Sequence, residues 1–240
     1  MQGVPKCNQN EISPMCHHQM YRQESIDKHA AMLRQFAPRN SLPNEQLHNT
    51  ILLETTDFIV TPTPGSIVPH WMIVWPKRYF PNFLALQRQT EKNTKGIALD
   101  IKKQIAPDID NFIWFEHGGY SPNSIVGCGI NFAHFHIIID PSFEFGDFRH
   151  RVEETKQMNW KVCDDRKLQA GLAVHSDYHI FGNNELTVFR SDTTSLGSQF
   201  FRKVIAYLMG RSRMWNYKDH GFPKNTKKTI NRFATVDKLN

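Results

Sequence analysis

The sequence predicts an α+β protein built on an antiparallel sheet with flanking helices, extended at both termini. Two pairs of apolar, β-branched segments predict hairpins. The first pair is 51–60 and 67–75, joined by the turn 62-PTPG-65. The second pair is 172–181 and 185–190, joined by the turn Gly182-Asn183-Asn184. The helical patterns stand in separate blocks, and the sequence has no regular strand–helix–strand repeat. This separation favours an antiparallel sheet over a parallel one.

Two further strands and three helices complete the expected fold. The short apolar runs 111-NFIWFE-116 and 132-FAHFHIIID-140 are typical of buried strands. Apolar residues at a 3.6-residue period predict helices over residues 25–36, 83–105 and 198–208. Gly96 weakens the second of these helices, because glycine has a low helix propensity.

Length and composition indicate one compact domain. A chain of 240 residues with 40% hydrophobic residues can bury a sizeable core. We expect an N-terminal arm and helix over 1–50, a core over 51–150, and an extension over 151–240 that packs on this core. The sequence has no run of about 18 apolar residues and no signal-peptide pattern, and its four cysteines are irregularly spaced. We therefore expect a cytoplasmic protein without a membrane partner.

The formal net charge of +6 comes largely from residues 201–240. A basic surface attracts anions and speeds their encounter with the protein. The partner that we expect is a nucleotide or a nucleotide conjugate. Nucleic acid also fits the charge but is not favoured, and a solvated basic tail without a specific partner is the alternative. The sequence is also compatible with a homodimer.

The segment 127-GCGINFAHFHIIID-140 carries the candidate chemistry. Side chains alternate along a strand, so His134 and His136 share one face with their Cα atoms roughly 6.5 to 7 Å apart. Both imidazoles can therefore contact one ligand. Three interpretations are open: structural histidines bonded to backbone, a metal site completed by Asp140 or Glu144 and a distant third histidine, or a nucleophile towards phosphorus.

The third interpretation requires defined protonation states. His134 can attack a phosphoryl group if one ring nitrogen keeps its lone pair and a backbone carbonyl near the start of the strand holds the other. A protonated His136 would donate a hydrogen bond to a phosphate oxygen. Backbone N–H groups of the turn 127–129 would stabilise the developing charge. Gly127 and Gly129 permit this close approach of backbone to phosphate.

The segments 115-FEHG-118 and 127-GCGINFAHFHIII-139 resemble the histidine triad (HIT) superfamily of nucleotide hydrolases and transferases. The motif of that family is His-x-His-x-His followed by apolar residues. The resemblance extends to 58-FIVTPTPGSIVPHWMIVWPKRY-79, which is similar to the paired strands of the family, and it covers about residues 51–141. The segment 198-SQFFRKVIAYLMG-210 and the residues Trp215, Asn216 and Tyr217 are similar to the tail of a bacterial HIT-like branch related to dinucleoside-polyphosphate hydrolases and nucleotidyltransferases.

The resemblance implies roles for the two histidines. His134 stands at the middle motif position, the family nucleophile that forms a nucleotidyl-histidine intermediate. His136 stands at the last position and favours hydrolysis, because phosphorylase and uridylyltransferase branches carry glutamine there. Two positions depart from the pattern, since Phe132 replaces the first histidine and Tyr79 replaces the histidine that ends the upstream segment. The family uses the backbone carbonyl at the first position to orient the nucleophile, and phenylalanine also supplies one.

Further residues are expected to bind the nucleotide or its phosphates. They come from the glycine-rich turn, the loop before it, the apolar slot that the family forms for a nucleobase, and the start of the late helix. The N-terminus of a helix favours anions. They are Gly127, Cys128, Gly129, Asn131, His117, Pro62, Gln199 and Arg202. His117 is also a candidate donor to the leaving group. Solvation, loop bridging or packing is the alternative role for each.

The sequence thus predicts a HIT-like nucleotide hydrolase or nucleotidyltransferase that acts at the α-phosphate through a nucleotidyl-histidine intermediate. This step requires no cofactor or metal, although Mg²⁺ can accompany a polyphosphate substrate. A nucleotide-binding module without turnover and a metal-dependent small-molecule enzyme are the alternatives. Cys7, Cys16, His17 and His18 suggest a zinc site, but eight residues separate the two cysteines, a looser spacing than structural zinc sites usually have.

Overall fold

The computed structural model describes residues 47–90, 92–120, 124–126, 132–155, 160–163, 176–191 and 194–233. The expected helix over 25–36 and the suggested zinc site at Cys7, Cys16, His17 and His18 lie outside these residues. The division of the chain at residues 50 and 150 stays a prediction.

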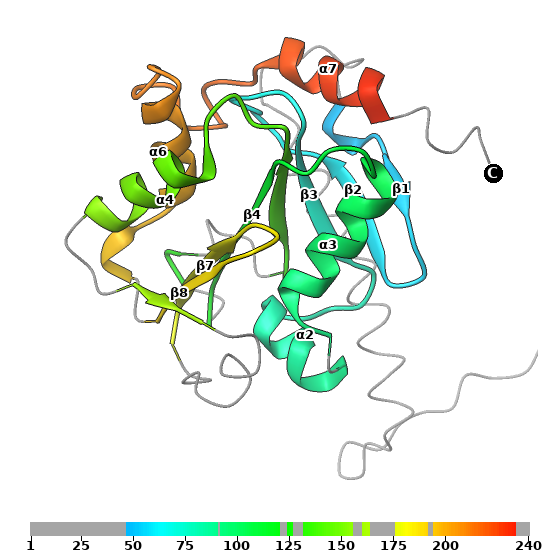
Figure 1. Cartoon of the computed structure of the whole chain (residues 1–240), viewed down its shortest axis with the longest axis vertical. Coiled ribbons are helices and arrows are strands. Elements are labelled where there is room, and N and C mark those ends of the chain that lie inside the picture. The colour runs from blue at the N-terminus through cyan, green and yellow to red at the C-terminus, as the bar shows by residue number, and fades with distance from the viewer. Residues whose placement is uncertain are drawn as a thin grey trace, which may run out of the picture.

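An eight-stranded antiparallel sheet forms the centre of the fold, which confirms the predicted α+β class (Figure 1). The strands lie in the order β1-β2-β3-β5-β4-β7-β8-β6. Their bounds are β1 Leu53–Glu54, β2 Phe58–Pro62, β3 Trp71–Pro76, β4 Phe112–Gly118, β5 Phe135–Ile139, β6 Lys161–Val162, β7 Tyr178–Gly182 and β8 Thr187–Ser191. Both expected pairings form, β2 with β3 and β7 with β8.

Five α-helices surround the sheet in the described part of the chain. They are α2 Phe83–Thr90, α3 Thr94–Ile105, α4 Phe145–Glu154, α6 Phe200–Leu208 and α7 Pro223–Phe233, and two 3₁₀ turns are η1 Leu47–Asn49 and η3 Thr194–Leu196. None of these helices has both the length and the apolar character needed to cross a membrane. The sequence patterns did not identify α4 or α7.

The two faces of the sheet bury separate apolar clusters. One face carries Trp114 and Phe135 and packs against α2 and α3 (Figure 1). The other face carries Phe115 and Phe181 and packs against α4 and α6. Alternation along each strand assigns every side chain to one of these two layers. The register of the strands therefore decides which polar residues share a face with the histidines.

Several expected boundaries differ in the structure. The helix expected over 83–105 is two helices, because the side chain of Asn93 accepts a hydrogen bond from the N–H of Gly96 and caps a new helix there. Strand β4 runs two residues further than expected, so His117 lies in a strand and not in a loop. The late helix begins at Phe200, with Gln199 as its N-cap in a left-handed conformation.

Glu116 fixes the start of α2 to the central strand β4. One of its carboxyl oxygens accepts the N–H of Phe83 at 2.8 Å, and the other accepts the hydroxyl of Tyr178 at 2.6 Å. Burial raises the pKa of Glu116 to about 8, although both hydrogen bonds oppose this shift. Glu116 precedes His117 on β4, so the same contacts fix the strand that carries His117.

We expect the folded protein to lose stability between about pH 6.5 and pH 8 because of Glu116. A carboxyl group whose pKa is raised by folding holds its proton longer in the folded state, so stability falls as pH rises towards the folded pKa. The buried histidines have lowered pKa values, so their protonation changes the stability only below about pH 6.5. The loss should reach about 2 kcal/mol in urea unfolding, and it should be absent in Glu116→Gln.

Asp108→Asn provides the control, because Asp108 is an exposed carboxylate. This variant should lose stability over the same pH interval as the wild type. An equal loss in Glu116→Gln would contradict the assignment.

Candidate active site

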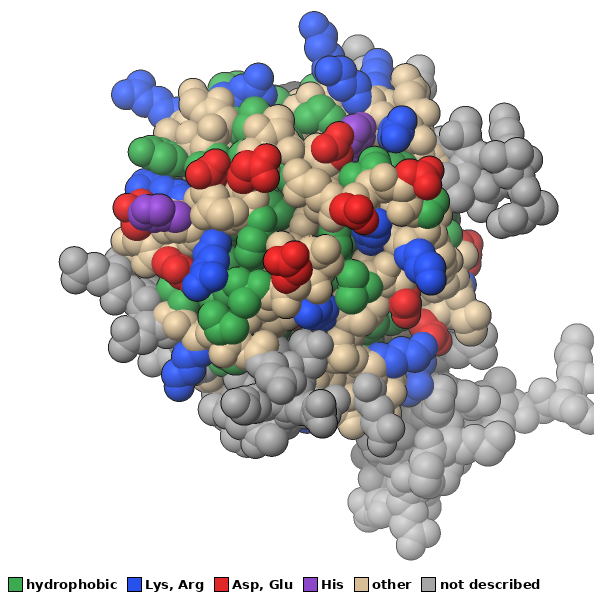
Figure 2. Space-filling model, viewed as in Figure 1, with side chains coloured by type: hydrophobic (Ala, Val, Ile, Leu, Met, Phe, Trp, Pro, Cys, Tyr) green, Lys and Arg blue, Asp and Glu red, His purple; other side chains and the backbone are tan. Residues whose placement is uncertain are grey.

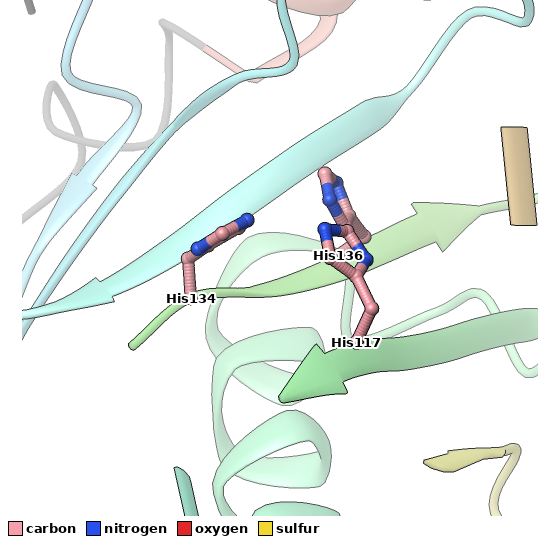
Figure 3. A group of neighbouring side chains, drawn as sticks. All are labelled: His117, His134 and His136. Carbon is pink, nitrogen blue, oxygen red and sulfur yellow. The ribbon is translucent and has the colours of Figure 1, made fainter. Parts of the chain in front are cut away.

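Three histidines meet on the sheet face that carries Phe115. His117 lies near the end of β4, His136 lies on β5, and His134 directly precedes β5 (Figure 3). The ring centroid of His134 is 5.2 Å from that of His117, and both are 5.5 Å from that of His136. One nitrogen of each ring lies within 4.8 Å of the other two. All three side chains are buried, so these nitrogen atoms lie close together away from bulk water.

The main chain fixes the tautomer of His134. Its Nδ1 lies 2.8 Å from the carbonyl oxygen of Phe132, and because a carbonyl only accepts, Nδ1 must carry the proton. Burial lowers the pKa of His134 to about 3, with a further contribution from His117, so the ring is neutral. Ala133 holds this segment in place by donating its N–H to Phe80 at 2.7 Å. His134 therefore has its lone pair on Nε2, as the nucleophile interpretation requires.

An indole fixes the opposite tautomer in His136. Nε1 of Trp71 donates to Nδ1 of His136 at 3.1 Å, and an indole N–H cannot accept. Burial lowers the pKa of His136 well below its usual value, and repulsion from the protonated forms of His117 and His134 and from the charge of Arg202 lowers it further. A neutral His136 thus carries its proton on Nε2. We expected a protonated His136 from the sequence. In the structure the ring is neutral, and it still has one N–H to donate.

The same contact disfavours a metal at the cluster. His117, His134 and His136 have the proximity of a metal site. A metal bound to Nε2 of His136 would leave the proton on Nδ1, where it would face the N–H of Trp71. The carboxylates considered with the metal interpretation, Asp140 and Glu144, are exposed. The arrangement is better suited to an anion that accepts the Nε2–H of His136.

Aromatic side chains form a wall beside His134. The ring of Trp75 lies 5.0 Å from that of His134, and Trp75 packs in one cluster with Phe132 and Tyr79. The rings of Phe132 and Tyr79 meet edge to face at 5.7 Å. These are the two positions at which the resemblance to the HIT family expects histidine. The two departures therefore contact each other, and an aromatic pair stands where two imidazoles were expected.

Arg202 links α6 to the loop between β2 and β3. Its guanidinium donates to the carbonyl oxygens of Trp215 at 2.8 Å and Pro64 at 3.2 Å, and also to that of Gly65. The side chain of Gln199 donates to Asn216 at 3.3 Å. These contacts give Arg202 and Gln199 structural partners, and contact of either side chain with phosphate stays a prediction.

The charge of Arg202 nevertheless acts on the cluster. Burial and, to a smaller extent, the nearby charge of Arg202 lower the pKa of His117 to about 4. Arg202 also lowers the pKa of His136. A buried cation that disfavours protonation of its neighbours creates a positive potential. That potential favours an anionic ligand between the rings.

The structure places Pro62 on the opposite face from the histidines. Pro62 pairs with Met72, which pairs with Ile137, the neighbour of His136. Paired residues share a face and successive residues do not, so Pro62 lies on the face covered by α2 and α3. The β2 residues on the histidine face are Ile59 and Thr61. The expected contact between Pro62 and a nucleotide at the cluster does not fit this register.

Four of the expected phosphate-binding residues cannot be placed. Gly127, Cys128, Gly129 and Asn131 lie outside the described residues, and the role of the glycine-rich turn stays a prediction.

A fourth histidine, which the sequence patterns did not identify, adjoins the cluster. His179 on β7 pairs with His117 on β4, and their ring centroids are 6.4 Å apart. Its ring lies 5.4 Å from that of Phe200 and 5.1 Å from that of Phe201, and burial lowers its pKa well below the usual value. The strand pattern over 172–181 was visible, but its pairing with β4 has no local signal in the sequence.

Comparison with known proteins finds similarity only among solved structures. No family model matches the chain, and neither does any curated protein sequence. The chain is structurally similar to the yeast Ap4A phosphorylase Apa2, with a TM-score of 0.38 and 13% identity over 68% of this chain and 64% of that one. The chain thus spans just under two thirds of that relative.

Two complexes of the same yeast protein match over longer stretches. The complex with Ap4A has a TM-score of 0.37 and 11% identity, over 83% of this chain and 81% of that one. The complex with AMP has a TM-score of 0.37 and 14% identity, over 85% and 97%. Similarity at this level transfers neither an activity nor a residue role to this chain.

We expect the two neighbouring histidines to show opposite tautomers in ¹⁵N NMR spectra. His134 should carry its proton on Nδ1 and His136 on Nε2, and neither should titrate between about pH 5 and pH 8, because burial lowers both pKa values. Trp71→Phe removes the indole donor and should release the tautomer of His136 while that of His134 stays fixed. The same tautomer on both rings in the wild type would contradict the hydrogen-bond assignment.

Proposed function

We propose that this protein is a nucleotide hydrolase or nucleotidyltransferase that acts at the α-phosphate through a nucleotidyl-histidine intermediate on His134. The observation that carries the proposal is the hydrogen bond between Nδ1 of His134 and the carbonyl of Phe132 at 2.8 Å. It leaves the lone pair on Nε2, in a ring that lies beside the imidazoles of His117 and His136 and the indole of Trp75. The cationic surroundings of the cluster also support a phosphate ligand.

The proposed reaction has two displacements at phosphorus. In the first, Nε2 of His134 forms a bond to the α-phosphorus, and the bond from phosphorus to the leaving-group oxygen breaks. In the second, water or another acceptor attacks the same phosphorus and gives its proton to His117, and the P–N bond breaks to return the electron pair to Nε2. The carbonyl of Phe132 stabilises the positive charge that develops on the ring while the P–N bond exists. Nε2–H of His136 is the donor to a non-bridging oxygen.

His117 is the proposed proton donor to the leaving group. Phe132 provides no imidazole, and the ring of His117 is 5.2 Å from that of the nucleophile. In the absence of an anion, burial and Arg202 hold the pKa of His117 at about 4. A bound phosphate brings negative charge beside the ring, which raises this pKa and allows His117 to bind a proton with the substrate.

The proposed step uses no resident metal. The contact between Trp71 and His136 supports this, because it directs the Nε2 proton of His136 towards the ligand position. Mg²⁺ would enter only with a polyphosphate substrate and would bind mainly to its phosphates.

Covalent trapping tests the nucleophile. Incubation with a dinucleoside polyphosphate labelled at the α-phosphate, followed by rapid denaturation, should leave acid-labile label on the wild-type protein. His134→Ala should carry none. His150→Ala is the matched control, because His150 is exposed on α4, and it should retain full labelling. Binding of nucleotides without label or turnover across several substrates would instead indicate a binding module.

Leaving-group dependence tests His117. With a poor leaving group, His117→Gln should lower kcat by about 10²- to 10⁴-fold, the usual contribution of a general acid. With a good leaving group, which departs without a proton, the loss should nearly vanish. Equal losses with both substrates would assign His117 a structural role.

A further inference from the structure

The whole net charge of the protein is concentrated in one short segment. Residues 211–232 contain seven basic residues and a single acid, Asp219. The basic residues are Arg211, Arg213, Lys218, Lys224, Lys227, Lys228 and Arg232, and all of them are exposed. Without this segment, the 29 basic and 23 acidic residues of the chain would be reduced to equal numbers. The excess of positive charge therefore belongs to one segment of the sequence.

Helix α7 presents four of these cations on a single face. Lys224, Lys227, Lys228 and Arg232 follow the three- and four-residue spacing of one helix side and span about 12 Å. The opposite side, with Thr226, Thr229 and Phe233, is buried. Figure 2 shows Lys and Arg side chains gathered at the top of the molecule, where Figure 1 places α7.

The inner side of α7 is bonded to the loop between β2 and β3. Asn225 donates from its side chain to the carbonyl oxygens of Ser66 and Ile67, each at 2.9 Å. The hydroxyl of Thr229 accepts the N–H of His70 at 2.9 Å. These contacts hold the helix in one orientation. The basic face is thus a fixed surface of the fold and not a solvated tail.

This arrangement of charges is unfavourable for the helix itself. Lys224 and Lys228, and also Lys228 and Arg232, are like charges four residues apart, and each such pair destabilises a helix by roughly 0.2 to 0.5 kcal/mol. Lys224 also lies in the first turn, where the helix dipole disfavours a cation. The helix contains no acid to offset these charges. A polyanion bound to this face would remove the repulsion.

We propose that the basic face of α7, extended by the exposed cations of residues 211–218, binds the phosphate backbone of nucleic acid. A row of lysines and arginines without acids is suited to phosphates, whereas lysine is depleted in the cores of protein interfaces. An amphipathic helix that inserts into a membrane needs an exposed apolar face, and the apolar face of α7 is buried. Tyr217 packs with Trp75 and Phe132, so the basic surface adjoins the histidine cluster. The proposal does not depend on the proposed catalytic activity.

Charge reversal on the full-length protein tests this surface. Binding of a fluorescent single-stranded oligonucleotide should weaken at least about tenfold in Lys224→Glu/Lys228→Glu. For four phosphate contacts, the plot of log affinity against log salt should have a slope of about −3 in the wild type and about half of that in the variant. The control is Arg88→Glu/Lys103→Glu, which makes the same charge change at exposed positions on α2 and α3. It should keep the wild-type slope and affinity to within about twofold.

The α7 variant should remain folded, because it removes like-charge pairs and places an acid in the first helical turn. Circular dichroism and thermal unfolding check this point. Equal binding by the wild type and the α7 variant would overturn the proposal, as would an equal loss in the control. Vesicles with phosphatidylserine serve as the competing anionic surface, and binding to them without binding to the oligonucleotide would also overturn it.

Discussion

The hydrogen bond between His134 and the carbonyl of Phe132 decides how the histidine cluster can react. A carbonyl only accepts, so the proton of the ring is held on Nδ1 and the lone pair is left on Nε2. The bond depends on the backbone alone, which explains how a phenylalanine can occupy this position. Ala133, bonded to Phe80, keeps the carbonyl in place just before β5 begins. The geometry of the nucleophile is thus set by main-chain contacts of the two residues that precede it.

Burial and positive charge together determine what the cluster can bind. The pKa values of His117, His134 and His136 are all lowered, mainly by burial, and Arg202 adds to the effect at two of them. Neutral rings have no charge to attract a ligand, but their surroundings carry a positive potential. The indole of Trp71 directs a proton of His136 into the same space. An anion with acceptor oxygens is therefore favoured over a cation.

Much of the fold and the centre of the site could be predicted from the sequence, because strand alternation and turn residues act locally. Alternation placed His134 and His136 on one face, and the hairpins β2–β3 and β7–β8 followed from apolar runs around turns. Pro62 was assigned to a nucleobase slot from the resemblance alone, and the strand pairing that puts it on the face opposite the histidines has no local signal in the sequence. His179 was missed because its approach to His117 depends on the pairing of β7 with β4, which no local pattern encodes.

A crystal structure with a non-hydrolysable nucleotide would show whether Nε2 of His134 points at phosphorus. We expect an α-phosphorus within about 3.5 Å of this nitrogen, in line for attack, with Nδ1 still bonded to the carbonyl of Phe132. A nucleotide bound away from the cluster, or a metal ion held between the three imidazoles, would contradict the account.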